Sequence, residues 1–331
     1  MNLVTGASGL LGSHIVEQLV AAGEPLRVLV RPTSDTRLLD EWGVDQAVGD
    51  VTDVDSLRRA MKDVARVYHV AAQVGDWGPW ERFAAVTIDG TRNMLAAARD
   101  AGVSRFLHVS SISAYGHPDG EGVVLDESAP LGAGLHRWSY YSRAKVEAEK
   151  LAWAAHEAQE VAVTVVKPSW LYGPRDRASM PRLVRAIRAG KAKLLGDGSN
   201  RLNLTYAGNE AEGCILAATK EQAAGQSYNL ASDGVITQRE YINKIAECLG
   251  CEPVTKTVPY GVARSAAFMM ELFGHALRRK APPLVTRYSV WLIGRKCFFS
   301  SEKARRELGW KPTVGYDEGI RLAVEWCLAN A

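Results

Sequence analysis

The sequence VTGASGLLG at residues 4–12 places three glycines, Gly6, Gly9 and Gly12, between a short apolar run and a helical pattern. Glycine has no Cβ, so this spacing suits a tight turn from a strand into a helix and a close approach of the backbone to a ligand. The amino end of the following helix would hold a pyrophosphate, because its N–H groups and its dipole favour negative charge. A plain strand-to-helix turn is the alternative, but the flanking strand and helix favour a dinucleotide site.

The first half of the chain alternates short, valine-rich apolar runs with segments of helical hydrophobic spacing. This alternation predicts parallel strands joined by helical crossovers, because each crossover covers one face of the sheet. Strands buried on both faces carry such near-continuous apolar sequence. We therefore expect an α/β fold with a Rossmann-type, doubly wound parallel sheet. The expected strands are residues 2–5, 26–30, 45–48, 66–70, 105–109 and 161–167.

The alternation ends after Pro168, where proline- and glycine-containing segments follow. We expect a dinucleotide-binding Rossmann domain over residues 1–168 and a smaller, mainly helical C-terminal lobe for the substrate over residues 169–331. One alternative stays open, in which residues 202–230 return to the sheet. The expected elements of the lobe are a strand at 202–206 and helices around 181–189, 238–249 and 262–278.

Composition narrows the class of protein. The chain carries 40 basic and 37 acidic side chains, a formal net charge of +3, which is too balanced for nucleic acid as the principal partner. No apolar stretch approaches membrane-spanning length, and Met1 runs directly into the first expected strand, which leaves no room for a signal peptide. We therefore expect a cytoplasmic protein.

The five cysteines are scattered and include a single Cys-x-x-Cys pair, so we expect reduced thiols and no metal site.

Arg31 follows the second expected strand, where NAD-binding proteins of this fold usually carry an acidic residue for the ribose 2′-hydroxyl. A guanidinium forks onto a phosphate, so Arg31 predicts a preference for NADP over NAD. The alternative is an arginine that leaves the strand and is simply solvated. In that case NAD remains the cofactor.

Tyr141 and Lys145 stand four residues apart in a segment of helical pattern, which stacks them on one face of a helix. Of the 11 tyrosines, only Tyr141 has a lysine at this spacing. A tyrosine titrates near about 10 and a neighbouring ammonium favours its phenolate, so the pair suits a general acid/base that moves a proton on a substrate oxygen. A hydroxyl from Ser110 or Ser111, which end another apolar run, would polarise the same oxygen. With the glycine turn, these residues predict a nicotinamide-dependent oxidoreductase.

Further motifs accompany these residues over essentially the whole chain. They are Gly49-Asp50-Val51, His69-Val70-Ala71-Ala72, Gly90-Thr91-Arg92-Asn93, Tyr172-Gly173-Pro174 and Leu308-Gly309-Trp310-Lys311-Pro312. In this combination the chain resembles the extended short-chain dehydrogenase/reductase family, and most of all its 3β-hydroxysteroid dehydrogenase-like and dihydroflavonol reductase-like enzymes. It departs from the family pattern at Thr87, where many relatives carry asparagine, and at Lys167, where an arginine is common.

The resemblance implies roles for individual residues. Tyr141 would be the general acid/base, and Lys145 would also bond the nicotinamide ribose. Ser111, rather than Ser110, would be the catalytic hydroxyl, because it lies four residues before Tyr115. Other residues would line the cofactor at the turn and at the ends of the strands. They are Gly6, Ser8, Gly9, Leu10, Leu11, Gly12, Arg31, Asp50, Val51, Ala71, Ala72 and Pro168.

Tryptophans give the best indication of the substrate. Trp170 stands where nucleotide-sugar epimerases and dehydratases typically carry asparagine, and an indole stacks on apolar groups but offers a single donor to a diphosphate. The segment 76–80, with Trp77, looks like the corresponding loop of 3β-hydroxysteroid dehydrogenase-like enzymes and of reductases acting on long-chain β-keto acids. We predict that Trp77, Trp138 and Trp170 line the substrate pocket, with ordinary packing as the alternative.

The segment 262–284 is apolar and contains the basic run 278–280, and three interpretations stay open for it. It covers a hydrophobic pocket, it forms a core helix with a solvated C-terminal cap, or it makes a weak contact with a membrane surface.

Together these observations predict hydride transfer between a nicotinamide cofactor and a mainly hydrophobic ketone or secondary alcohol, such as a steroid, a β-keto acid or a flavonoid. The first alternative is a nucleotide-sugar epimerase or dehydratase, which shares this machinery. The second is an NADP-sensing protein without catalysis, which would not need Ser111, Tyr141 and Lys145. Because dimers are common in the family, a homodimer is a further expectation.

Overall fold

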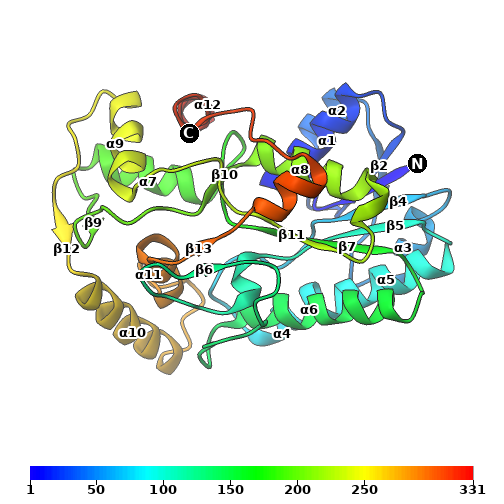
Figure 1. The fold of residues 1–331 in the computed structure, drawn as a ribbon, viewed down its shortest axis with the longest axis horizontal. Coiled ribbons are helices and arrows are strands. Elements are labelled where there is room, and N and C mark those ends of the chain that lie inside the picture. Colours follow the sequence, from blue (N-terminus) through cyan, green and yellow to red (C-terminus); the bar gives the residue numbers. More distant parts are fainter. Residues whose placement is uncertain (331) are drawn as a thin grey trace.

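A seven-stranded parallel sheet lies at the centre of the computed structural model, which describes residues 1–330 (Figure 1). Its strand order is β11-β7-β5-β4-β1-β2-β3, and every neighbouring pair is parallel. The order reverses between β1 and β4, as in a doubly wound sheet, which confirms the predicted fold class. The strands are β1 (Asn2–Thr5), β2 (Leu26–Val30), β3 (Asp45–Val48), β4 (Arg66–His69), β5 (Arg105–Val109), β7 (Val163–Pro168) and β11 (Ser227–Leu230).

Helices cover both faces of this sheet, one layer above and one below it in Figure 1. One face packs on α1 (Leu10–Ala21) and α8 (Ala207–Thr219). The other packs on α3 (Val54–Ala60), α5 (Gly90–Asp100) and α6 (Tyr140–Glu157). The crossovers between the first strands therefore lie where the apolar spacing predicts them, since each turns its apolar stripe to the sheet.

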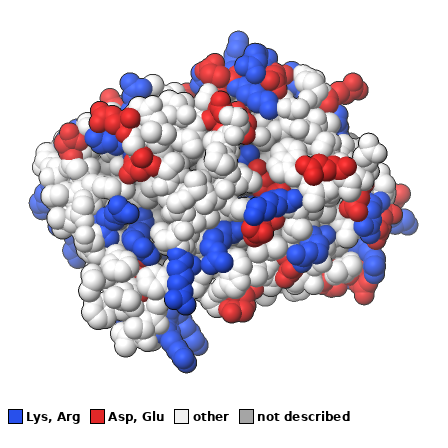
Figure 2. All heavy atoms as spheres, turned by 60° about the horizontal axis from the view of Figure 1, so that its bottom comes forward, with Lys and Arg blue, Asp and Glu red and all other residues white. Residues whose placement is uncertain are grey.

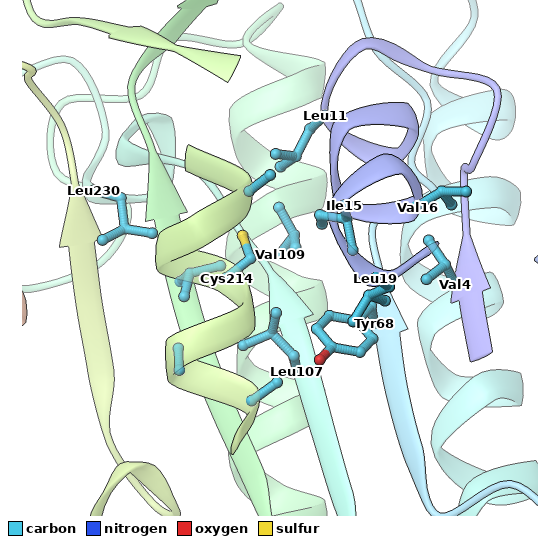
Figure 3. Packing of buried hydrophobic residues seen from close by; sticks show 14 of the residues in the cluster. Val4, Leu11, Ile15, Val16, Leu19, Tyr68, Leu107, Val109, Cys214 and Leu230 are labelled. Carbon is cyan, nitrogen blue, oxygen red and sulfur yellow. The ribbon is translucent and has the colours of Figure 1, made fainter. Parts of the chain in front are cut away.

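The face beneath α1 and α8 is a continuous apolar core. In Figure 3, Ile15 and Leu19 of α1 and Cys214 of α8 point toward Tyr68 and Leu107 on the strands, and all five are buried. Burying each large apolar side chain contributes about 1.5–3 kcal/mol to folding. This core fixes α1, and with it the glycine turn at its amino end.

The C-terminal part of the chain forms a second apolar cluster. Around it lie α7 (Ser179–Arg188), α9 (Gln238–Cys248) and α12 (Tyr316–Ala329). A helical hairpin of α10 (Tyr260–Ala276) and α11 (Arg287–Gly294) lies apart from this cluster, at the lower left of Figure 1. Within residues 1–330, no helix combines the length and the apolar character needed to cross a bilayer.

The remaining elements are short. The strand predicted at 202–206 forms as β10 (Leu204–Tyr206) and pairs with β8 (Trp170–Tyr172) outside the central sheet. The short helices are α2 (Arg37–Glu41), α4 (Trp80–Phe83), η1 (Ala84–Asp89), η2 (Ile112–Tyr115), η3 (Glu221–Ala223) and η4 (Ala304–Leu308). The short strands are β6 (Val124–Leu125), β8 (Trp170–Tyr172), β9 (Leu194–Leu195), β10 (Leu204–Tyr206), β12 (Thr257–Val258) and β13 (Phe298–Phe299).

Glu210 of α8 gives the fold a predictable pH dependence. Its side chain is fully buried, and neither carboxyl oxygen has a hydrogen-bond partner among the described residues. Burial raises the pKa of this carboxyl well above its usual value, and Asp233 adds to the shift. As the pH rises past the ordinary pKa of a glutamate, the Glu210 carboxyl ionises in the unfolded chain but stays protonated in the folded protein. Stability therefore falls until the pH passes the folded pKa.

We expect Glu210→Gln to reduce this loss of stability with rising pH. Thermal unfolding between about pH 5 and pH 8 would show a smaller fall in Tm for the variant than for the wild type. Glu221→Gln, at an exposed position after α8, is the matched control and should keep the wild-type slope. Equal slopes for wild type and Glu210→Gln would contradict the assignment.

Candidate active site

The glycine turn connects β1 to α1 and exposes backbone groups to a ligand. Gly6 has a positive φ of 69°, and the N–H of Gly9 donates to the Gly6 carbonyl at 2.9 Å. A Cβ on Gly12 would lie 2.1 Å from the same carbonyl oxygen, so only glycine fits there. Gly9 caps α1 without a side-chain hydrogen bond, which leaves the N–H groups of the first helical turn for an anion. The turn therefore fits the pyrophosphate of a dinucleotide.

Two hydroxyl groups fix the chain where β4 ends, beside this turn. Thr5 accepts hydrogen bonds from the N–H groups of Val70 and Ala71, both at 3.1 Å. Thr87, one of the departures from the family pattern, accepts from the N–H of Gln73 at 3.0 Å. The segment after β4 is thus held at the point where the strand order reverses, which is where open α/β sheets bind their ligands.

The other predicted cofactor residues follow the carboxyl ends of the strands. Such ends meet at one edge of a parallel sheet, so these residues lie on the same side as the glycine turn. Arg31 is exposed, Ser8 and Leu10 are half-buried, and Leu11 packs into the core, so only the backbone of Leu11 is available to a ligand. The rest are Asp50 and Val51 after β3, Ala71 and Ala72 after β4, and Pro168 at the end of β7.

α6 brings Tyr141 next to the end of β5. Burial raises the pKa of the Tyr141 phenol, and a hydrogen bond with Ser111 acts in the opposite direction. The Ser111 hydroxyl also accepts from the N–H of Ser113 at 3.1 Å, which fixes its position at the start of η2. The structure therefore brings Ser111 and Tyr141 into contact.

Lys145 lies one helical turn from Tyr141 and is buried, with 4% of its surface exposed. Its Nζ donates to the Val109 carbonyl at 2.7 Å. Burial lowers the pKa of Lys145 to about 8, and the negative charge of Glu149 opposes the shift. Near neutral pH this lysine, one helical turn from Tyr141, is therefore still mainly protonated, although burial disfavours its charged form.

Ser110 belongs to a different, buried network. Its Oγ donates to Glu149 at 2.6 Å, and Glu149 pairs with Lys167 at 2.8 Å. Both charged side chains are almost fully buried, and Lys167 also lies over the Tyr115 ring at 5.1 Å. Lys167, the second departure from the family pattern, therefore neutralises Glu149. Since Ser110 is engaged there, Ser111 is the hydroxyl that adjoins Tyr141.

Tyr288 of α11 is a site residue that the sequence analysis missed. Its ring lies edge-on to Tyr141 with centroids 6.0 Å apart, and its hydroxyl contacts Ser113 Oγ at 2.8 Å. Beside it, His117 contacts Ser142 Oγ at 3.1 Å, and burial lowers the pKa of His117 to about 3, so this imidazole is neutral. No spacing in the sequence marks Tyr288, because only tertiary packing brings it to α6.

Trp77 and Trp138 lie together against α10. Their ring centroids are 4.3 Å and 4.4 Å from that of His275. Tyr140, the neighbour of Tyr141 in sequence, lies 6.5 Å from the same imidazole. Two of the three predicted tryptophans thus meet at the amino end of α6, where α10 covers them.

Trp170 lies in another cluster. It packs edge-on against Tyr241 with ring centroids 5.6 Å apart, at the margin of the C-terminal core. The structure does not bring it into contact with Trp77 or Trp138, and its role toward the substrate stays a prediction.

Comparison with known proteins defines the class of the chain. The model of the NAD dependent epimerase/dehydratase family matches residues 2–231, so the chain belongs to that family. One relative is the 2-alkyl-3-oxoalkanoate reductase of Stenotrophomonas maltophilia, with 32% identity over 96% of this chain and 97% of the relative. Another is the 4-hydroxy-2-methyl-3-oxo-4-farnesyl-3,4-dihydroquinoline-1-oxide ketoreductase of Stigmatella aurantiaca, with 31% identity over 96% of this chain and 93% of the relative. A third is the decarboxylating sterol-4-alpha-carboxylate 3-dehydrogenase of Mus musculus, with 29% identity over 97% of this chain and 89% of the relative.

Solved structures agree with this class. The crystal structure of gox2253 has a TM-score of 0.83 and 29% identity, with 100% of this chain and 98% of the other covered. The DesIV dTDP-glucose 4,6-dehydratase of Streptomyces venezuelae, a double mutant solved with NAD bound, has a TM-score of 0.78 and 25% identity, with coverage of 100% and 97%. The predicted family and reaction class are confirmed: the chain is an oxidoreductase of the extended short-chain dehydrogenase/reductase type, with a nicotinamide dinucleotide as its cofactor.

Proposed function

We propose that this oxidoreductase interconverts a hydrophobic ketone and the corresponding secondary alcohol, with NADP as the preferred cofactor. The observation that carries the proposal is the contact between Ser111 and Tyr141, one helical turn from the buried Lys145. When bound, the nicotinamide dinucleotide supplies or accepts the hydride at the substrate carbon. The glycine turn and the ends of β2, β3, β4 and β7 would hold that cofactor.

Each of the three side chains has a chemical role in this proposal. During reduction, Tyr141 gives its phenolic proton to the substrate oxygen, and during oxidation it takes that proton back. Ser111 donates a hydrogen bond to the same oxygen, where negative charge develops. The Lys145 ammonium stabilises the phenolate that is left, which counters the effect of burial on Tyr141. It would also hold the nicotinamide ribose of the bound cofactor.

The proposed substrate is mainly apolar. The names of two relatives specify a 2-alkyl-3-oxoalkanoate and a 3-oxo compound with a farnesyl group, so both name an oxo group together with an alkyl or farnesyl chain. In this chain, Trp77 and Trp138 offer apolar surface close to the start of α6, because both rings pack on His275 of α10, whose imidazole lies 6.5 Å from the Tyr140 ring. A 3-oxo acid with a long alkyl chain is therefore the first substrate to try.

A panel assay tests the function directly. The purified protein would be incubated with NADPH and, in parallel, with 2-alkyl-3-oxoalkanoates, steroid ketones, flavonoid ketones and UDP- or dTDP-sugars. We expect loss of NADPH absorbance with an apolar ketone. No consumption with any ketone, despite cofactor binding, would reject the proposal.

A nucleotide-sugar epimerase or dehydratase is the second candidate, because the DesIV dehydratase shares the whole fold. It predicts sugar conversion without net consumption of NADPH, which the same panel detects. Trp170, at the position where such enzymes typically carry asparagine, weighs against it.

The preference for NADP rests on Arg31. We expect Arg31→Ala to raise KM for NADPH by about 10–100-fold, since a hydrogen bond between charged groups contributes about 1.5–3 kcal/mol, and to leave KM for NADH nearly unchanged. Arg37→Ala is the control, because Arg37 stands six residues further along the same connection after β2 and is engaged by Asp35 at 2.9 Å. Equal use of both cofactors by the wild type, unaffected by Arg31→Ala, would contradict the preference.

The proposal also includes three expectations about domain organisation, cellular location and oligomeric state. Residues 1–168 would form the cofactor-binding domain and residues 169–331 the substrate-binding lobe, with the return of 202–230 to the first domain as the alternative. The protein would act in the cytoplasm and as a homodimer. Mass photometry of the purified protein tests the last point.

A further inference from the structure

The outer face of α10 and the segment after it is unusually apolar. Half of the large hydrophobic side chains that are exposed in the described residues lie between positions 262 and 284. They are Val262 (58% exposed), Phe268 (40%), Met269 (45%), Met270 (38%), Leu272 (40%), Phe273 (58%), Leu277 (71%) and Leu284 (91%). Contiguous apolar surface of this kind on a globular protein marks a site of interaction.

α10 is nevertheless firmly attached by its other face. Ala267, Glu271 and Gly274 form a buried stripe at helical spacing. Glu271 pairs with Arg287 of α11 at 2.6 Å, and a Cβ on Gly274 would lie 2.8 Å from the Trp77 ring. α10 is therefore well packed on its inner side. No other part of the described chain covers its apolar outer face.

Positive charge accompanies this apolar face. Arg264, Arg278, Arg279 and Lys280 are all exposed. Between positions 260 and 284, Glu271 is the only acidic residue, and it is turned inward. Figure 2 shows the lobe at the lower left, where Figure 1 places α10, as mostly white with a run of blue side chains beside it. The face is thus both apolar and cationic.

We propose that α10 is an interfacial helix that seats the protein on an anionic lipid surface. A helix that lies in the interface buries its apolar side chains at the headgroup–acyl boundary, while neighbouring Lys and Arg side chains attract anionic headgroups. The exposed apolar side chains lie mainly on α10, and the basic run 278–280 follows shortly after the helix ends at Ala276. The interaction is peripheral, since no described helix has the character to span a bilayer.

Charge argues against a second copy of the chain as the occupant. In a two-fold dimer the same patch meets itself, so the basic residues at 264 and 278–280 would face a surface that carries no acidic residue to neutralise them. An anionic bilayer offers the complementary charge over the whole face. The membrane is therefore the better partner.

The same helix links the membrane to the proposed chemistry. Its inner side covers Trp77 and Trp138, which lie beside Tyr140. An apolar ketone dissolved in the bilayer would meet these rings first. This consequence rests on the proposed function, whereas lipid binding itself does not, so the two can fail separately.

Flotation of the full-length protein with vesicles tests the proposal without any catalytic readout. Vesicles of phosphatidylcholine with phosphatidylglycerol would be compared with pure phosphatidylcholine vesicles, at low and at high salt. We expect binding to the anionic vesicles at low salt and weaker binding at high salt, because salt screens the attraction. Absence of flotation with anionic vesicles at low salt would overturn the proposal.

Variants assign the binding to α10. The double variant Phe273→Glu/Leu277→Glu should lose flotation by about tenfold or more, since each buried apolar side chain contributes about 1.5–3 kcal/mol. Val124→Glu/Val235→Glu is the matched control, because these positions are 62% and 66% exposed but lie outside α10. Equal flotation of the α10 variant and the wild type would overturn the assignment. A third outcome is that neither protein floats, that the wild type is a dimer and that the α10 variant is a monomer. This result would mean that a second copy of the chain, not a membrane, covers the face.

Discussion

Tyr141→Phe should lower kcat with an apolar ketone by about 100-fold or more, because a positioned general acid/base contributes about 10²–10⁴-fold to the rate. The change removes only the phenolic hydroxyl, which lies next to Ser111. The ring keeps its edge-on packing against Tyr288 at 6.0 Å, so the fold and the cofactor site stay intact. KM for NADPH should therefore remain close to the wild-type value. Steady-state kinetics, followed by loss of NADPH absorbance, give both numbers.

Tyr140→Phe provides a control of identical chemistry one position earlier on α6. The Tyr140 ring packs against Trp80 with centroids 5.7 Å apart and faces α10 rather than Ser111. Loss of its hydroxyl should leave kcat nearly unchanged. A loss below about tenfold for Tyr141→Phe, or equal losses for the two variants, would remove Tyr141 from the proton transfer.

Local sequence patterns predicted six of the seven strands of the sheet, and they marked the residues proposed for the centre of the site. Valine-rich runs define strands because a buried parallel strand needs apolar residues on both faces, and all six expected strands form, with β7 beginning at Val163. The glycine turn is visible because its backbone conformations require glycine, as the positive φ of Gly6 shows. Tyr141 and Lys145 are visible because both lie on one helix, one turn apart.

The rest of the site depends on contacts between distant parts of the chain. Tyr288 reaches Ser113 from α11, and no periodicity connects the two. The choice of Ser111 over Ser110 came from the family resemblance, whereas its physical basis, the engagement of Ser110 by Glu149 of α6, depends on tertiary structure. The exposure of α10 was undecidable for the same reason, because a core helix and an interfacial helix share an apolar sequence and differ in what surrounds them.

Glu149 should be one of the most sensitive positions for stability. Its carboxylate is 1% exposed, pairs with Lys167 at 2.8 Å and accepts from Ser110 at 2.6 Å. Glu149→Ala would leave the Lys167 ammonium, 2% exposed, without its counter-ion. Removing one partner of a buried ion pair costs about 3–5 kcal/mol, because the other charge stays desolvated. Chemical denaturation should therefore show a fall of this size in the free energy of unfolding.

The double variant Glu149→Met/Lys167→Met separates the charge effect from simple loss of packing. It removes both charges and keeps most of the volume, so it should recover most of the stability that Glu149→Ala loses, since apolar replacements of buried pairs are often neutral or stabilising. Glu147→Ala on the same helix is the surface control. Its ion pair with Lys150, at 2.9 Å, is half-exposed and should contribute no more than about 1 kcal/mol. A loss for Glu149→Ala as small as that for Glu147→Ala would mean that Lys167 finds another partner or reaches water. In that case the buried pair does not explain why lysine stands at this position.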